Sequence, residues 1–155
     1  MERPNAWLTY SDADMQDLET VAKKYRHFLN VGKTERECIT QIVKEAEEAG
    51  YVSLEEKVKN GEDLKAGDKV YQVGMQKIIA LYHIGEEDLA QGMNILCAHI
   101  DSPRLDIKQN PLYEDTDLAY LDTHYYGGVK KYQWVALPMA MHGVIVKKDG
   151  TVVNV

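Results

Sequence analysis

His99 and Asp101 are the residues of this sequence whose types and spacing point most directly to metal chemistry. A neutral imidazole can bind zinc through one ring nitrogen while a carboxylate accepts a hydrogen bond from the other, which fixes the tautomer and raises the basicity of the ligand. In an extended chain, residues i and i+2 point to the same side. The pattern therefore predicts a metal-ligating histidine whose ring is held by an aspartate.

The element that must position this pair is the apolar segment before it. Residues 93–98, Met-Asn-Ile-Leu-Cys-Ala, have the composition of a short buried strand. The Ser102-Pro103 step after the pair is expected to end that strand and to stiffen the turn. Histidine and aspartate would then stand at the downstream end of a strand, where sheet-based metallohydrolases present a ligand.

Longer segments around and after the pair extend this interpretation. They are residues 98–108 (AHIDSPRLDIK), 110–115 (NPLYED), 122–134 (DTHYYGGVKKYQW) and 141–146 (MHGVIV). Together they resemble the bacterial branch of the aspartyl aminopeptidase and aminopeptidase I family of dizinc metallopeptidases, most clearly from about Lys77 to Gly150. The resemblance implies that His99 binds one of two zinc ions and that Asp101, the candidate catalytic residue, orients its imidazole. It places the remaining ligands and the general base outside these 155 residues.

The same resemblance implies a fold class and a domain boundary. The expected fold is α/β, a zinc-exopeptidase-like mixed sheet with flanking helices, interrupted by an inserted β-rich dimerisation domain. Residues 1–104 would be the N-terminal part of the catalytic domain, and residues 105–155 the beginning of the inserted domain. A hairpin signal at residues 148–151 precedes an apolar strand that ends the sequence, so we expect a truncated chain, the front part of a longer protein.

Two amphipathic helices are predicted before the sheet. Ser11 with Asp14, and Thr34 with Glu37, form capping-box starts. Apolar residues then recur at helical spacing, and both stripes are expected to be buried core. Those of the first helix are Met15, Leu18, Val21, Ala22, Tyr25 and Leu29, and those of the second, which Gly50 ends, are Ile39, Ile42, Val43, Ala46 and Ala49. Residues 70–73 and 77–84 read as two paired strands.

Composition excludes some classes of partner. Acidic residues outnumber basic ones, 25 to 18, and the net charge is −7. The basic residues do not gather into a patch interleaved with aromatics, so neither nucleic acid nor an anionic membrane is expected as a partner. Cys38 and Cys97 are expected to be small core residues and not a disulfide. The sequence has no signal-peptide core and no membrane span, which favours the cytoplasm.

The function that the resemblance implies is removal of the N-terminal residue of peptides by a zinc aminopeptidase. In such a site two zinc ions share and activate a water while a glutamate takes its proton. Three protein ligands are the usual minimum for a catalytic zinc. We therefore expect the 155 residues alone to be inactive without the remainder of their polypeptide. The family forms large oligomers built from dimers, so a homo-oligomer is expected.

Two other functions stay open on the sequence alone. The chain could be a non-catalytic oligomerisation or regulatory module in which His99 holds no metal. Alternatively, Asp122 and His124 repeat the pair in reverse order and could join His99 and Asp101 in a self-contained mononuclear site.

Overall fold

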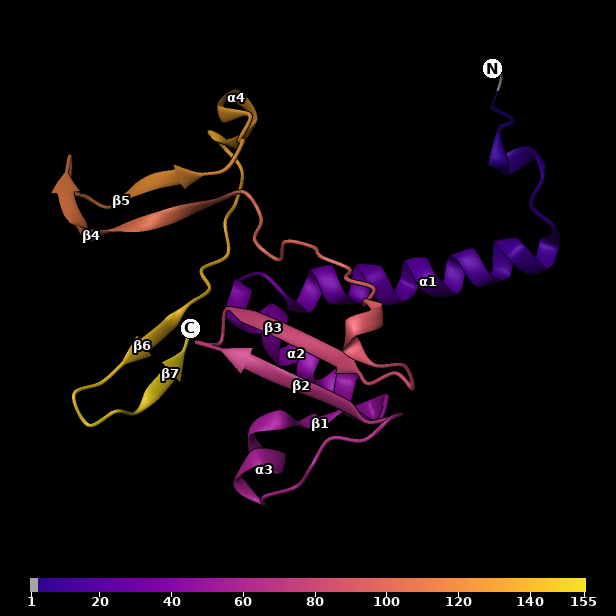
Figure 1. Cartoon of the computed structure of the whole chain (residues 1–155). Helices are drawn as coiled ribbons and strands as arrows, with labels where there is room; N and C mark the ends of the chain where they lie inside the picture. Colours follow the sequence, from indigo (N-terminus) through magenta and orange to yellow (C-terminus); the bar gives the residue numbers. More distant parts are fainter. Residues whose placement is uncertain (1–2) are drawn as a thin grey trace. The chain divides into compact units, whose positions relative to one another are not determined.

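The structure, a computed structural model, describes residues 3–155 (Figure 1). The chain divides into two compact units, one ending at Ile95 and the other beginning at Leu96. In chain order the elements are η1 (Ala6–Leu8), α1 (Asp12–Val31), α2 (Glu35–Glu48), β1 (Val52–Ser53), α3 (Leu54–Lys59), β2 (Lys69–Gly74), β3 (Ile78–His83), η2 (Leu89–Gln91), β4 (Arg104–Asp115), β5 (Leu118–Tyr126), α4 (Lys131–Trp134), β6 (Val144–Val146) and β7 (Val152–Asn154). This mixed composition matches the predicted α/β class. Within residues 3–155, none of the helices combines the length and the apolarity needed to cross a bilayer.

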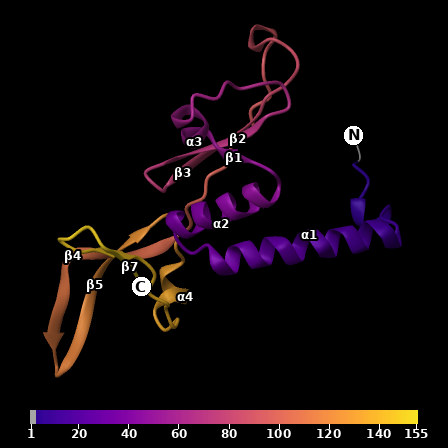
Figure 2. The same cartoon turned by 90° about the horizontal axis from the view of Figure 1, so that it is seen from below.

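Helix α1 begins at the predicted capping box. The Ser11 hydroxyl accepts a hydrogen bond from the Asp14 amide at 3.3 Å, and the Asp14 carboxylate accepts one from the Ser11 amide at 2.8 Å. The helix packs against α2 and extends well beyond it (Figure 2). Since burying an apolar stripe requires an opposing apolar surface, the part of α1 beyond α2 keeps its stripe in contact with solvent.

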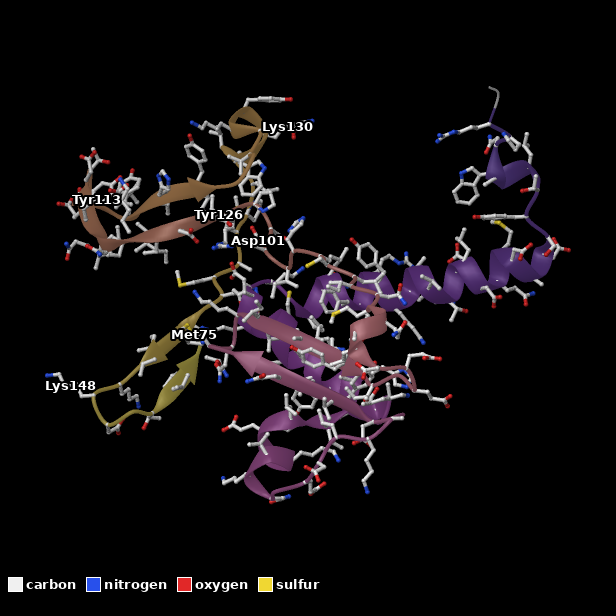
Figure 3. All side chains as sticks on the ribbon, in the orientation of Figure 1. Met75, Asp101, Tyr113, Tyr126, Lys130 and Lys148 are labelled. Atoms are coloured by element: carbon white, nitrogen blue, oxygen red, sulfur yellow. The ribbon has the colours of Figure 1, made fainter. Side chains whose placement is uncertain are left out.

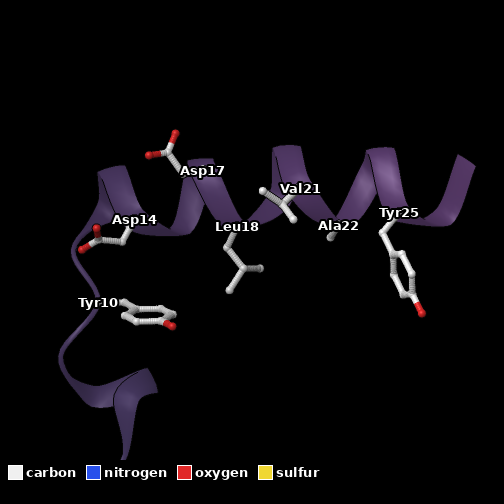
Figure 4. A pocket seen from close by; sticks show the side chains of 7 residues that line it. All are labelled: Tyr10, Asp14, Asp17, Leu18, Val21, Ala22 and Tyr25. Atoms are coloured by element: carbon white, nitrogen blue, oxygen red, sulfur yellow. The ribbon is translucent and has the colours of Figure 1, made fainter. Parts of the chain in front are cut away.

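The prediction that this stripe is buried core is therefore wrong. Val21 and Tyr25 are 66% and 61% exposed. Figure 4 shows Leu18, Ala22 and Tyr25 pointing to the side of α1 on which Tyr10 lies. Together these side chains line a shallow hollow on the first unit.

Helix α2 confirms its predicted start, its end and most of its apolar face. Thr34 and Glu37 form the capping box. At the other end Gly50 adopts a φ of +86°, its amide donates to the Glu47 carbonyl at 3.0 Å, and the Tyr51 amide donates to the Ala46 carbonyl at 2.9 Å. This pair of hydrogen bonds is a Schellman motif, and it favours glycine because left-handed backbone strains residues with a Cβ.

The sheet of the first unit lies against α2. Strand β1 pairs in parallel with β2, and β2 pairs antiparallel with β3, as predicted for the second pair. Helix α2 lies between α1 and this sheet (Figure 2). Val70 of β2 is 1% exposed, and the other buried apolar residues of the described chain all come from α2: Cys38, Ile39 and Ala46. The core of this unit is thus the contact between α2 and the sheet.

The second unit contains two separate hairpins. Strands β4 and β5 pair antiparallel from Arg104 opposite Tyr126 to Asp115 opposite Leu118, with an irregularity between Ile107 and Leu112. Strands β6 and β7 form the other hairpin. Its turn lies at the predicted residues 148–151, where Gly150 has a φ of +86°.

Candidate metal centre

The segment that carries the His99–Asp101 pair is not paired with any strand of residues 3–155. Residues 92–103 have no regular secondary structure, so the predicted strand over 93–98 is wrong. Leu96 is 98% exposed, and Cys97 is exposed instead of buried. A strand requires a neighbour that completes its ladder of backbone hydrogen bonds. No strand of residues 3–155 pairs with this segment.

The two side chains nevertheless meet as the spacing requires. Nδ1 of His99 lies 3.0 Å from the backbone carbonyl oxygen of Asp101 and 3.2 Å from its carboxylate Oδ1. Both of these neighbours are acceptors, so the neutral imidazole carries its proton on Nδ1 and keeps its lone pair on Nε2. The His99 side chain is 85% exposed, and Nε2 has no hydrogen-bond partner among residues 3–155. A metal ion can therefore reach Nε2.

The second oxygen of the Asp101 carboxylate has a different partner. The Tyr126 hydroxyl donates to Oδ2 at 2.7 Å, and Figure 3 labels both residues. This hydrogen bond is the main cause that lowers the pKa of Asp101, followed by a backbone amide and by His99. At neutral pH Asp101 is thus an ionised acceptor with one oxygen on the histidine and the other on the tyrosine.

The start of the β4–β5 hairpin holds this arrangement in place. Arg104 lies opposite Tyr126 in the ladder, and its guanidinium stands 4.2 Å from the centre of the tyrosine ring. Arg104 Nε also donates to Asp106 at 2.7 Å. Gly127 has a φ of +74°, and a Cβ there would lie 3.3 Å from the Cα of Pro103. The residues just after Asp101 are therefore packed closely against the end of β5.

The alternative mononuclear site does not form. Asp122 makes an ion pair with Lys108 at 2.9 Å, and the His124 ring stacks on Tyr125 with 5.1 Å between the ring centres. Among residues 3–155, no group of three or more histidines, cysteines, aspartates and glutamates is placed to hold a metal ion. The structure therefore brings His99 and Asp101 together, whereas Asp122 and His124 make other contacts.

Most of the sequence matches the model of a known family. The model of the aminopeptidase I zinc metalloproteases (M18) covers residues 28–154. The chain belongs to the M18 family. This confirms the resemblance that residues 98–146 carry.

Curated M18 relatives are similar over nearly the whole of this chain. The probable M18 family aminopeptidase 1 of Clostridium acetobutylicum is 56% identical over 99% of the chain, and that of Thermotoga maritima is 42% identical over all of it. In both cases the match covers 33% of the relative. The chain therefore spans about a third of the length of the curated M18 relatives it matches.

Solved M18 structures have the same fold over this region. Aminopeptidase I from Clostridium acetobutylicum superposes with a TM-score of 0.83 at 56% identity, covering 100% of this chain and 34% of that one. Aminopeptidase I from Borrelia burgdorferi B31 gives 0.90 at 34% identity, covering 98% and 37%. The predicted α/β fold class is thereby confirmed, since the chain matches a part of the M18 fold. The boundary near Arg104 stays a prediction.

The sequence interpretation missed two neighbours of the candidate site: Tyr126, which contacts Asp101, and Arg104, which contacts Tyr126. Tyr126 lies in one of the segments that resemble the family, but neither its type nor its spacing from Asp101 marks it as a partner. The signal that could have found it is the pairing register of β4 and β5, which sets residue 126 opposite residue 104.

Proposed function

We propose that the intact gene product is a zinc-dependent aminopeptidase that hydrolyses the N-terminal residue of peptides, with two zinc ions in the complete site. The observation that carries the proposal is the contact between His99 Nδ1 and Asp101, which turns Nε2 outward. Membership of a family of zinc metalloproteases supports the identity of the metal. His99 is then a zinc ligand, and Asp101 is the residue that orients it.

The residues present fit one ligand position of a zinc site. Asp101 holds the proton on Nδ1, and its negative charge raises the basicity of Nε2, the nitrogen that faces solvent. Exposure of the ring leaves room for further ligands and for a substrate around Nε2. When bound, zinc lowers the pKa of a water and polarises the scissile carbonyl. Asp101 stays ionised throughout because its hydrogen bonds stabilise the carboxylate, so the imidazole keeps one tautomer.

We further propose that the remaining ligands, and the glutamate that takes the proton of the water, come from polypeptide outside these 155 residues. Support comes from the relatives, of which this chain spans about a third. Residues 1–104 would belong to the catalytic domain, and residues 105–155 would begin an inserted dimerisation domain. Exposed apolar side chains on the β4–β5 hairpin, among them Leu112 at 72% and Leu118 at 58%, support a dimer contact there. A cytoplasmic homo-oligomer is part of the proposal.

The test is a peptidase assay on the purified intact gene product. A panel of dipeptides that differ in their first residue is compared with the same peptides acetylated at the N-terminus. We expect cleavage of free peptides only, because an aminopeptidase recognises the free amine. His99→Ala should abolish cleavage, while His124→Ala, which changes an exposed histidine stacked on Tyr125, should keep it. Absence of cleavage and of bound zinc in the wild type would favour the non-catalytic module instead.

A further inference from the structure

The Asp101 carboxylate is shared between two side chains, and only one of them is the proposed ligand. Oδ1 faces His99 and Oδ2 accepts the hydrogen bond from Tyr126. We propose that Tyr126 is a positioning residue of the zinc site, whose hydroxyl fixes the Asp101 carboxylate and through it the direction of His99 Nε2. This inference rests on the proposed function and names a further residue that the site depends on.

The need for such a residue follows from where Asp101 lies. It stands on a segment without secondary structure, and its side chain is 34% exposed. Rotation of a carboxylate about its terminal torsion is broad and nearly twofold, so a free aspartate at such a place samples many orientations. A second hydrogen bond on the opposite oxygen removes that freedom. Oδ1 then stays turned toward Nδ1 of His99.

Tyr126 itself is held by the hairpin. Its backbone is paired with Arg104 at the last position of the β4–β5 ladder, and its ring lies under the Arg104 guanidinium at 4.2 Å. A cation over an aromatic face at an exposed site contributes about 0.5–1 kcal/mol. Gly127, the next residue, contacts Pro103 closely. The hydroxyl is thus carried by a strand paired in a ladder, and it reaches across to the segment without secondary structure that bears the ligand.

The variant that isolates the hydroxyl is Tyr126→Phe, because the ring and its contact with Arg104 remain. The matched control is Tyr120→Phe, also on β5, whose ring stacks on Tyr113 at 5.3 Å. Zinc retained by the intact gene product is measured at a series of free zinc concentrations set by a chelator buffer. The zinc counted in this comparison is the zinc that the wild type retains and His99→Ala does not. We expect Tyr126→Phe to weaken its binding about threefold to tenfold, no more than the loss expected on removing Asp101 itself, and Tyr120→Phe to leave it unchanged.

A double-mutant cycle separates positioning from a merely structural effect. In an Asp101→Ala background the hydroxyl has no carboxylate to hold, so we expect Tyr126→Phe to cause no further loss of zinc affinity. An equal loss in both backgrounds would overturn the inference, because the tyrosine would then act on the fold and not through Asp101. Unchanged zinc binding in Tyr126→Phe, with a clear loss in His99→Ala, would also overturn it and leave the proposed function intact. Unchanged zinc binding in His99→Ala would overturn both.

Discussion

Nδ1 of His99 contacts Asp101 twice, at 3.0 Å through the backbone carbonyl oxygen and at 3.2 Å through the carboxylate Oδ1. The carbonyl oxygen is present whatever side chain occupies position 101. The tautomer of the imidazole is therefore favoured by the backbone, while its basicity is raised by the carboxylate. These two contributions can be separated by mutation.

Replacing Asp101 by alanine should weaken zinc binding at the His99 site without abolishing it. Partners of this kind typically contribute a factor of about 10 to 100 in metal affinity, and the remaining backbone acceptor places our expectation near the lower end. Asp122→Ala is the matched control, since Asp122 pairs with Lys108 and does not contact His99. Zinc retention in chelator buffers measures both variants. Equal retention in wild type and Asp101→Ala would contradict the orienting role.

Gly127→Ala should disturb the site through the backbone. Left-handed conformation costs a residue with a Cβ about 1–2 kcal/mol, and the new Cβ would lie 3.3 Å from the Cα of Pro103. We expect weaker zinc binding and faster amide hydrogen exchange at the start of β4, measured by mass spectrometry on the intact gene product. Gly128→Ala is the control, because apart from its chain neighbours no heavy atom of residues 3–155 lies within 4 Å of a Cβ there, and its φ is not left-handed. Equal zinc binding and equal hydrogen exchange in the two variants would show that the close approach of Gly127 to Pro103 does not affect the site.

Tyr71 ties β2 to α2, and its ionisation should report that contact. Its hydroxyl donates to Glu47 at 2.7 Å, and this hydrogen bond, together with burial, raises the pKa of Tyr71 from 10.0 to about 12. A pKa raised in the folded state means that the contribution to stability is complete below pH 10 and is lost as the pH rises toward about 12. The tyrosinate absorbance of wild type minus that of Tyr71→Phe should give a midpoint near pH 12. A midpoint near pH 10 would contradict the contact.

Local signals in the sequence were sufficient for the two long helices, for the pairing of β2 with β3 and for the turn between β6 and β7. Capping boxes at Ser11 and Thr34 and the glycine at position 50 depend only on neighbours within a few residues, and all three are present. The two-residue strand β1 and the six-residue helix α3 are too short for a periodic pattern, and the sequence interpretation missed both. Burial was harder to predict, because it depends on what lies opposite. The stripe of α1 has the right period and is still exposed.

In the site, too, the contact between near neighbours in the sequence was predicted and the contact between distant residues was not. The His99–Asp101 contact follows from a spacing of two residues, so the sequence predicted it. Tyr126 is 25 residues from Asp101. Counting in regular register from the Asp115–Leu118 pair would set Arg104 opposite Val129, whereas the irregularity between Ile107 and Leu112 sets it opposite Tyr126. Pro111 lies inside this irregularity and is typical of a bulge, but it does not fix how far the register shifts, so the third member of the network was found in the structure.

Zinc content is the direct test of whether His99 binds zinc. Elemental analysis of the intact gene product is compared for wild type, His99→Ala and His124→Ala after equilibration in the same zinc buffer. We expect about two zinc ions per chain in the wild type and in His124→Ala, and a clear reduction in His99→Ala. Equal zinc content in wild type and His99→Ala would contradict zinc binding by His99.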